Sequence, residues 1–258
     1  MLTSGSQQGI EYSARLFVNP GDVVITENPT YTGTIGAFNQ YCPTYVPVDM
    51  DEDGMKMDEL EKALKAHPDA KMIYTIPDFQ NPTGITMSLE RRLKLLELAE
   101  QYGVPVVEDS PYYEIRFAGE RIPPLRALDK KGIVIYLGSF SKTFCPGLRL
   151  GWICAPRELA RKFTLIKQSA DLQVNMLAQY QLYKYLTTYD FDKQCDKVRA
   201  VYKRHRECMI QTMDQEFPDT VSYTRPEGGM FVWVTLPSYV DTGSMLSVAL
   251  ENGVTYTP

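Results

Sequence analysis

The segment GIVIYLGSFSKTFCPGLRLGW, residues 132–152, contains an apolar run that ends in a turn of small and hydroxylic residues. The run GIVIYLGSF (132–140) is typical of a strand buried on both faces. Lys142 follows it closely, and Arg149 stands seven positions further on. A lone loop lysine is ordinarily solvated, because removing an ammonium group from water is costly. A buried lysine instead supplies a neutral, nucleophilic amine suited to Schiff-base chemistry, and this segment alone leaves both interpretations open.

Three similar apolar runs precede this segment, at 22–29, 70–77 and 104–111. Amphipathic helices are predicted between them, at 57–67 and 88–103. The second begins at a capping serine, Ser88, and ends at Gly103. Strands that alternate with helices predict an α/β fold, with a mostly parallel sheet covered by helices on both faces.

The pattern changes after Trp152. Helices are predicted at 156–172, 175–189 and 190–217, and the long, charged third helix is expected to bridge two lobes. A hairpin at 221–237 follows, and then a helix, a glycine stop and a strand within 244–258. We therefore predict a large domain at 1–189 and part of a smaller α+β domain at 190–258.

The composition is that of an ordinary globular protein, with 258 residues, 44% hydrophobic and 23% charged. A net charge of −5 disfavours a nucleic-acid surface. No run is long enough to span a bilayer, and the first residues show no signal-peptide pattern. Five scattered cysteines favour a reducing cytoplasm. The two histidines lie in charged, helix-like surroundings, so we expect neither a metal site nor a histidine-based hydrolase.

Polar residues follow several of the predicted strands, where ligands of such sheets bind. Asn81 comes after the 70–77 run, Asp109 ends an apolar run, and Ser139 and Lys142 follow another. A buried Asp109 carboxylate would need a cationic partner, and a protonated pyridine nitrogen is one. A helix N-cap is the alternative role for this aspartate.

Further residues could hold the rest of such a ligand. Asn81 and Tyr112 offer hydrogen bonds to a phenolic oxygen, and Tyr31 could stack on a ring or serve only in packing. The turn TSGSQQG (3–9) precedes a predicted helix, whose free N–H groups attract an anion such as phosphate, although many such turns are plain caps. Ser139 and Arg149 could supply further phosphate donors, and a surface ion pair is the alternative for Arg149.

Three motifs occur in a specific order: NPTG (81–84), EDSPYYE (108–114) and SFSKTFCPGLRLGW (139–152). Together they resemble the fold-type I, pyridoxal-phosphate-dependent enzymes of the class I/II aminotransferase group, over essentially the whole chain. TSGSQQG, ENPTY and LGSFSK most resemble the 2-aminoadipate and kynurenine aminotransferase branch. The resemblance implies a PLP-dependent transferase fold and a transaminase that moves an amino group between an amino acid and a 2-oxo acid.

The resemblance also implies roles for single residues. Lys142 holds pyridoxal 5'-phosphate as a Schiff base and shuttles a proton, Asp109 pairs with the ring nitrogen, and Tyr112, a third catalytic residue, shares the ring oxygen with Asn81. Tyr31 lies against the ring, and the phosphate is bound by Ser6, Gln7, Ser139 and Arg149. A homodimer is implied as well. Members of the group carry further segments at both ends, so we expect an internal piece of a longer enzyme.

Two other functions stay open at this point. The chain resembles the effector domain of GntR/MocR-type transcriptional regulators, which sense the same cofactor. The cofactor also serves β-lyases and decarboxylases, which share the residues that hold it. The sequence does not name the amino donor or the acceptor.

Overall fold

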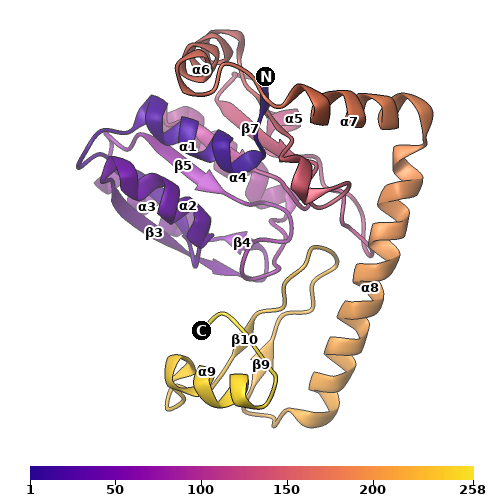
Figure 1. Ribbon diagram of the computed structural model, residues 1–258. Coiled ribbons are helices and arrows are strands. Elements are labelled where there is room, and N and C mark those ends of the chain that lie inside the picture. The colour runs from indigo at the N-terminus through magenta and orange to yellow at the C-terminus, as the bar shows by residue number, and fades with distance from the viewer.

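The computed structural model describes all 258 residues and contains an eight-stranded mixed sheet with helices on both faces (Figure 1). The strand order is β1-β8-β7-β6-β5-β2-β3-β4. The central strands β3, β2, β5, β6 and β7 pair in parallel, whereas β1, β8 and β4 are antiparallel to their neighbours. The strands are β1 (Leu2–Thr3), β2 (Val23–Asn28), β3 (Thr44–Asp51), β4 (Gly54–Met55), β5 (Met72–Thr75), β6 (Val106–Asp109), β7 (Val134–Ser139) and β8 (Gly151–Cys154). The predicted fold class is confirmed.

Two layers of helices cover the sheet. Helices α1 (Ser6–Phe17), α2 (Thr32–Phe38) and α6 (Arg157–Ala170) pack on one face, and α3 (Met57–Ala66), α4 (Leu89–Tyr102) and α5 (Leu125–Leu128) on the other. Each face has a core of 18 buried residues. The central strands are therefore buried on both sides, which explains their nearly continuous apolar sequences.

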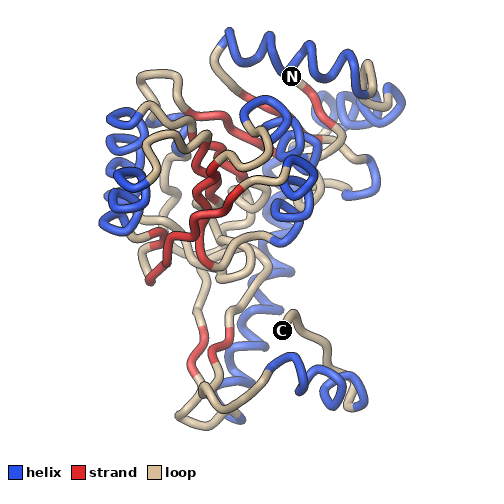
Figure 2. Tube along the Cα trace, turned by 90° about the vertical axis from the view of Figure 1, so that its left-hand side faces the viewer, coloured by secondary structure: helices blue, strands red, loops and turns tan.

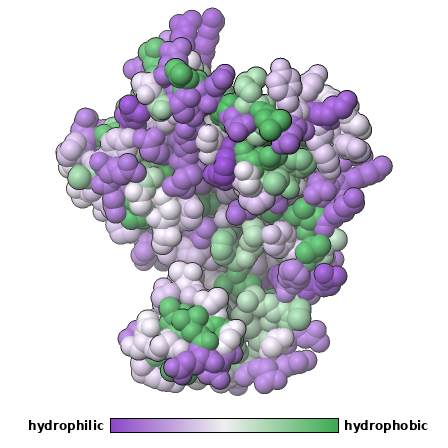
Figure 3. All heavy atoms as spheres, in the orientation of Figure 1, coloured by the Kyte–Doolittle hydropathy of each residue, from purple (hydrophilic) through white to green (hydrophobic).

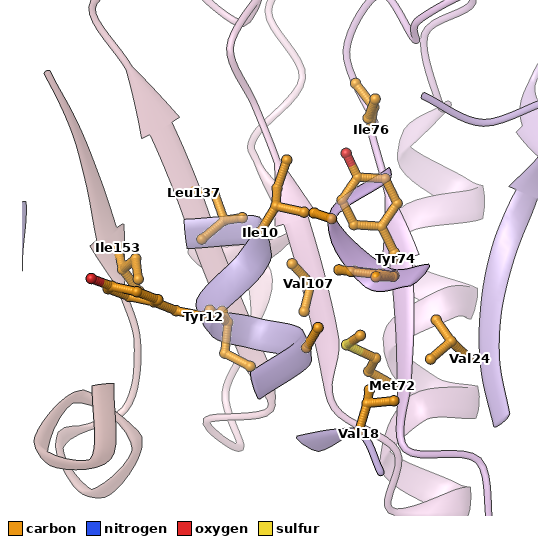
Figure 4. Packing of buried hydrophobic residues seen from close by; sticks show 14 of the residues in the cluster. Ile10, Tyr12, Val18, Val24, Met72, Tyr74, Ile76, Val107, Leu137 and Ile153 are labelled. Carbon is orange, nitrogen blue, oxygen red and sulfur yellow. The ribbon is translucent and has the colours of Figure 1, made fainter. Parts of the chain in front are cut away.

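Consecutive residues of one strand serve opposite faces. Val107 lies in the core under α1, whereas Val106 lies in the core under α4. On the first face, Ile10 of α1 lies against side chains of the central strands, and Tyr12 lies beside Ile153 of β8 (Figure 4). Because the central strands are parallel, their carboxyl ends all meet at one edge of the sheet.

The C-terminal part forms a separate lobe beyond that edge. Helix α7 (Met176–Thr188) leads into α8 (Phe191–Glu216), which runs from the sheet to a small hairpin of β9 (Ser222–Tyr223) and β10 (Val234–Thr235) and to α9 (Thr242–Glu251) (Figures 1 and 2). The hairpin loop is fastened to the large body where the amides of Phe117 and Ala118 both donate to the Glu227 carbonyl, at 3.0 Å each. The predicted boundary at residues 189 and 190 falls between α7 and α8 and stays a prediction.

The strand predicted at the end of 244–258 is wrong. Helix α9 and the stop at Gly253 are present, but residues 254–258 form neither helix nor strand. A strand needs a partner for its backbone N–H and C=O groups, and no strand of the structure pairs with this segment. The surface of α9 also carries exposed apolar side chains, Met245, Val248 and Leu250, which gather on the lower lobe (Figure 3).

No helix of the chain combines the length and the apolar surface that crossing a bilayer requires.

Helix α4 carries a buried arginine that ties the sheet edge to its helix layer. Ser88 caps the helix by accepting the Arg91 amide, and Gly103 ends it in the left-handed conformation at φ 67°. The Arg92 side chain is fully buried and donates to both oxygens of Asp78, at 2.9 and 3.2 Å. It also donates to the carbonyls of Met87, Pro77 and Pro123. These bonds fix the loop that runs from β5 to α4.

Replacing Arg92 with methionine should lower the free energy of unfolding by about 3–5 kcal/mol, because the buried Asp78 carboxylate would lose its hydrogen-bonded cation and keep only Arg116, 3.9 Å away. Urea unfolding followed by circular dichroism measures this. Arg91→Met is the matched control, since Arg91 pairs with Asp51 where both side chains are partly exposed. We expect it to cost about 1 kcal/mol or less. Equal losses in the two variants would contradict the role given to Arg92.

Candidate active site

The candidate site lies where the central parallel strands end. Asn28 ends β2 and leads to Tyr31, β5 leads to Asn81, and Asp109 ends β6. Ser139 ends β7, three residues before Lys142. The structure thus brings the predicted residues to one sheet edge, where ligands of such sheets bind.

Asp109 is a buried acid with one oxygen left without a partner. Its side chain is in a residue only 2% exposed, and its Oδ2 accepts a hydrogen bond from the Tyr74 hydroxyl at 2.9 Å. Its Oδ1 is buried and has no hydrogen-bond partner. Burial raises the Asp109 pKa to about 7, and the Tyr74 bond opposes that rise. Neither oxygen caps a helix, so the arrangement favours a buried cationic or hydrogen-donating ligand group at Oδ1.

Asn81 and Tyr112 form a second polar group beside Asp109. The Asn81 amide Nδ2 lies 3.4 Å from the Tyr112 hydroxyl oxygen. Tyr112 is buried, and this burial, followed by the charge of Asp109, raises the pKa of its phenol. Its ring also meets the ring of Phe231 edge-on, with centroids 5.7 Å apart, so the hairpin loop of the C-terminal lobe holds it in place. The two donors together suit a negatively charged ring oxygen.

The turn before α1 and the Arg149 side chain form an anion cradle. Gly5 stands at the N-cap of α1 with φ 79°, and no side chain caps the helix. The Arg149 guanidinium donates to the Ser4 carbonyl and to Ser141 Oγ, each at 3.2 Å. A Cβ atom on Gly5 would lie 2.3 Å from Arg149 Nη2. Glycine is therefore required for this close approach, which places a cation beside the free N–H groups of a helix start.

Ser139 belongs to the same cradle. It is buried, and its hydroxyl donates to Ser141 Oγ at 3.0 Å, which is also an acceptor for Arg149. Ser6 and Gln7 begin α1 and are half-buried. The Gln7 side chain donates to the Gly33 carbonyl at 2.7 Å, so its backbone N–H is the group left for an anion.

Tyr31 and Lys142 complete the set of predicted residues. Tyr31 is half-buried, and its pKa is raised by burial and by Asp109 and lowered by Arg149, so its phenol lies within electrostatic reach of both. Lys142 is half-buried, not fully enclosed, and its amine takes part in none of the ion pairs or side-chain hydrogen bonds formed by its neighbours. The predicted residues are thus gathered, with Lys142 on the turn between Ser139 and Arg149.

Three buried polar residues of this region were not identified from the sequence. Tyr74 lies in the apolar run 70–77, where nothing in the sequence marks its hydroxyl, although that hydroxyl donates to Asp109. Glu27 stands one residue before the end of β2, within an apolar run, and an acid in that position is the one signal that could mark it. Gln80 precedes Asn81 directly, and its side chain is fully buried.

The donor set fits one kind of ligand. It offers an acid for a cationic ring nitrogen, two neutral donors for a ring oxygen, a cradle for a phosphate dianion and an unpaired amine for a carbonyl carbon. Pyridoxal 5'-phosphate carries all four groups.

Comparison with known proteins agrees with this arrangement. Residues 1–258 match the family described as "Aminotransferase class I and II". The chain is 46% identical, over its whole length, to aromatic-amino-acid aminotransferase 1 of Thermococcus litoralis, of which it covers 63%. Its structure resembles a kynurenine aminotransferase of Pyrococcus horikoshii solved with PMP, with a TM-score of 0.97 and 44% identity, covering all of this chain and 65% of that one.

A third relative is LysN, the alpha-aminoadipate aminotransferase of Thermus thermophilus, solved with N-(5'-phosphopyridoxyl)-L-leucine. It has a TM-score of 0.95 and 38% identity, and the chain covers 67% of it. Weaker relatives include the uncharacterized HTH-type transcriptional regulator YisV of Bacillus subtilis, at 28% identity over the whole chain and 53% of the relative.

The chain therefore belongs to the class I and II aminotransferases. It spans somewhat less than two thirds of the length of the curated relatives it matches, 63% and 65% for the first two. Pyridoxal 5'-phosphate is the cofactor that membership of this family implies, and the residues at the sheet edge fit it.

Asp109→Asn should change how the stability of the cofactor-free protein depends on pH. The folded-state pKa of about 7 lies above the ordinary value of 3.8, so the wild type loses stability as the pH rises between these values. The variant lacks this loss. Its unfolding free energy should match the wild type near pH 4 and exceed it by about 2–4 kcal/mol near pH 8.

Urea unfolding across this pH range tests the prediction. Glu27 and Glu108 are also buried acids with pKa values raised to about 7, so both proteins keep part of the pH dependence. A constant difference between the two proteins at every pH would show that the Asp109 carboxyl keeps its ordinary pKa.

Proposed function

We propose that the protein is a pyridoxal-phosphate-dependent aminotransferase, which moves an amino group from an amino acid to a 2-oxo acid. The observation that carries the proposal is the buried Asp109 Oδ1 without a partner, at the same sheet edge as Lys142 and the anion cradle. A buried carboxylate needs a cationic partner, and the protonated ring nitrogen of the cofactor is the cation that this chemistry requires.

Each of the predicted site residues would hold one part of the cofactor. Asp109 binds the ring nitrogen, Asn81 and Tyr112 bind the ring oxygen, and Tyr31 lies against the ring. The phosphate is held by the α1 start at Ser6 and Gln7 and by Ser139 and Arg149. Each contact is directional, so the set fixes both the position and the plane of the ring.

Bound pyridoxal phosphate supplies an aldehyde that joins amines covalently and a cationic ring that accepts electron density from the substrate Cα. Lys142 would hold the cofactor through its aldehyde carbon, and its amine, once free, would move a proton at the substrate Cα as a general base and acid. Asp109 stays ionised beside the ring nitrogen and keeps the ring cationic throughout.

The relatives indicate the range of amino donors to test. The names of three of them refer to aromatic amino acids, kynurenine and aminoadipate, and a fourth, 39% identical with a TM-score of 0.94, is an archaeal alanine:glyoxylate aminotransferase. We propose a donor from this range, with 2-oxoglutarate as acceptor. A screen of amino donors with the complete gene product tests this. Pyruvate formed from a cysteine conjugate without any 2-oxo acid would instead indicate a β-lyase.

The regulator is the weaker alternative. The relatives with that name are 28–29% identical, against 46% for the aromatic aminotransferase. Amino transfer by the complete gene product would decide for the enzyme, and a basic helix-turn-helix upstream of residue 1 would favour the regulator.

We also propose that the protein works in a reducing cytoplasm, which its five free cysteines support.

Lys142→Ala should abolish the near-visible absorption that appears when the complete gene product is mixed with pyridoxal phosphate, because no other amine lies in this turn. Borohydride reduction followed by peptide mass spectrometry should find the cofactor mass on Lys142 in the wild type. Lys131→Ala is the control, since Lys131 is exposed and precedes the same strand. Absorption that survives in Lys142→Ala, or a label on another lysine, would remove Lys142 from its role.

A second copy of the chain is the proposed partner. Helix α7 exposes a row of large apolar side chains, which a monomer would leave in water. They are Met176, Leu177, Tyr180, Tyr183, Leu186 and Tyr189. A homodimer that pairs this face with its symmetry mate would cover them.

Tyr183→Asp should therefore shift the complete gene product from dimer to monomer in light scattering coupled to gel filtration, because it places a charge within an apolar contact. Lys62→Asp is the control, on an exposed site of α3 on the other face of the sheet. A dimer that persists in Tyr183→Asp would show that the contact lies elsewhere.

A further inference from the structure

Gln80 lies between the two loops that carry Tyr31 and Asn81. Its residue is fully buried, and all four hydrogen-bonding positions of its side-chain amide are occupied. The amide nitrogen donates to the Pro29 carbonyl at 2.8 Å, two residues before Tyr31. The amide oxygen accepts from the Thr83 amide at 2.9 Å and from the Thr83 hydroxyl at 2.8 Å, two residues after Asn81. One side chain thus joins both loops.

Glu27 fixes the orientation of this amide together with the Pro29 carbonyl and the Thr83 backbone N–H. The second hydrogen of the Gln80 amide nitrogen is donated to Glu27 Oε2 at 3.1 Å. Glu27 is 1% exposed, and its carboxylate also accepts from the Ile76 amide and the Thr75 hydroxyl, which fix it to the end of β5. A carboxylate only accepts, so it admits only the NH₂ side of the Gln80 amide. The reversed amide would place two acceptors against each other.

We propose that Glu27 and Gln80 are positioning residues for cofactor binding: the Glu27 carboxylate anchors the Gln80 amide nitrogen to the end of β5, and this amide holds the Tyr31 and Asn81 loops at the spacing the cofactor ring requires. The inference rests on the proposed function, since Tyr31 and Asn81 are the residues expected to touch the ring. Neither Glu27 nor Gln80 contacts the cofactor itself.

The backbone hydrogen bonds of the Asn81 loop show why a link between the two loops is needed. The Asn81 loop is an irregular turn held by two backbone hydrogen bonds. The backbone nitrogen of Gln80 donates to the Ile85 carbonyl at 2.8 Å, and that of Gly84 donates to the backbone carbonyl of Gln80 at 2.6 Å. These bonds set the turn itself but not its distance from the Tyr31 loop. Within this network, the Gln80 side chain bridges Pro29 and Thr83, so it sets the separation of the two ring contacts.

Glu108 offers a matched control. It too is a buried strand-end glutamate, 0% exposed, and burial raises its pKa to about 7 as it does for Glu27. Its carboxylate accepts the amides of Leu125 and Arg126, both at 2.8 Å, at the start of α5. None of the proposed cofactor contacts lies there. A general loss from removing a buried acid should therefore appear in both variants, and a positioning effect only at Glu27.

The experiment measures the dissociation constant of pyridoxal phosphate for the complete gene product by equilibrium dialysis, together with the wavelength of its near-visible band. Glu27→Met, Gln80→Met and the double variant form a cycle, with Glu108→Met as the control. Methionine matches the length of both side chains and leaves no buried charge. We expect each single variant to weaken binding about tenfold, and Glu27→Met to shift the band, because the donor to the ring oxygen is displaced.

The double variant separates the proposal from simple loss of packing. If Glu27 acts through Gln80, adding Glu27→Met to Gln80→Met should weaken binding by less than about twofold more. Losses that multiply in the double variant, unchanged affinity in Glu27→Met, or equal weakening in Glu108→Met would each overturn the inference. Should Glu27→Met fail to fold, Gln80→Met decides alone, and unchanged affinity there would overturn it. A wild type that binds no pyridoxal phosphate would instead overturn the proposed function.

Discussion

The burial of the Asp109 carboxyl at the end of β6 is the constraint on which the rest of the site depends. Burial raises its pKa, to about 7 even with the opposing hydrogen bond from Tyr74, which disfavours the ionised form that an electron-accepting cofactor ring needs beside it. The hydrogen bond from the Tyr74 hydroxyl partly offsets this, and a cationic ring nitrogen at the free Oδ1 would complete the compensation. The fold thus buries an acid whose Oδ1 has no hydrogen-bond partner until the ligand binds.

The alternation of side chains along the strands of the sheet makes this arrangement possible. Alternation along β6 sends Glu108 toward α5 and Asp109 toward the face covered by α1, so two adjacent acids serve different purposes. Glu108 has both oxygens satisfied by backbone amides, as a structural acid should. Asp109 has one oxygen satisfied by a side chain and one left free. The contrast between these neighbours, more than burial itself, distinguishes a ligand-binding acid from a structural one.

Much of this could be predicted from the sequence, because buried parallel strands have nearly continuous apolar sequences and their carboxyl ends carry the functional residues. The strands ending near Asn81, Asp109 and Ser139 were predicted for that reason. Strand β3 was not, since Pro47 interrupts it and several of its side chains are partly exposed. The terminal strand was predicted wrongly, because the alternating residues of 254–258 say nothing about whether a neighbouring strand is present to pair with them.

The residues that sequence reasoning missed share one property: their function depends on orientation. Tyr74 resembles any aromatic residue of a buried strand until its hydroxyl is found against Asp109. Gln80 gives no sign of bridging two loops, because Pro29 lies 51 positions away along the chain. A strand-end acid such as Asp109 can be recognised from sequence because its burial is costly whatever surrounds it. A buried amide is costly only when its four bonds are not made, and only the folded structure shows that they are.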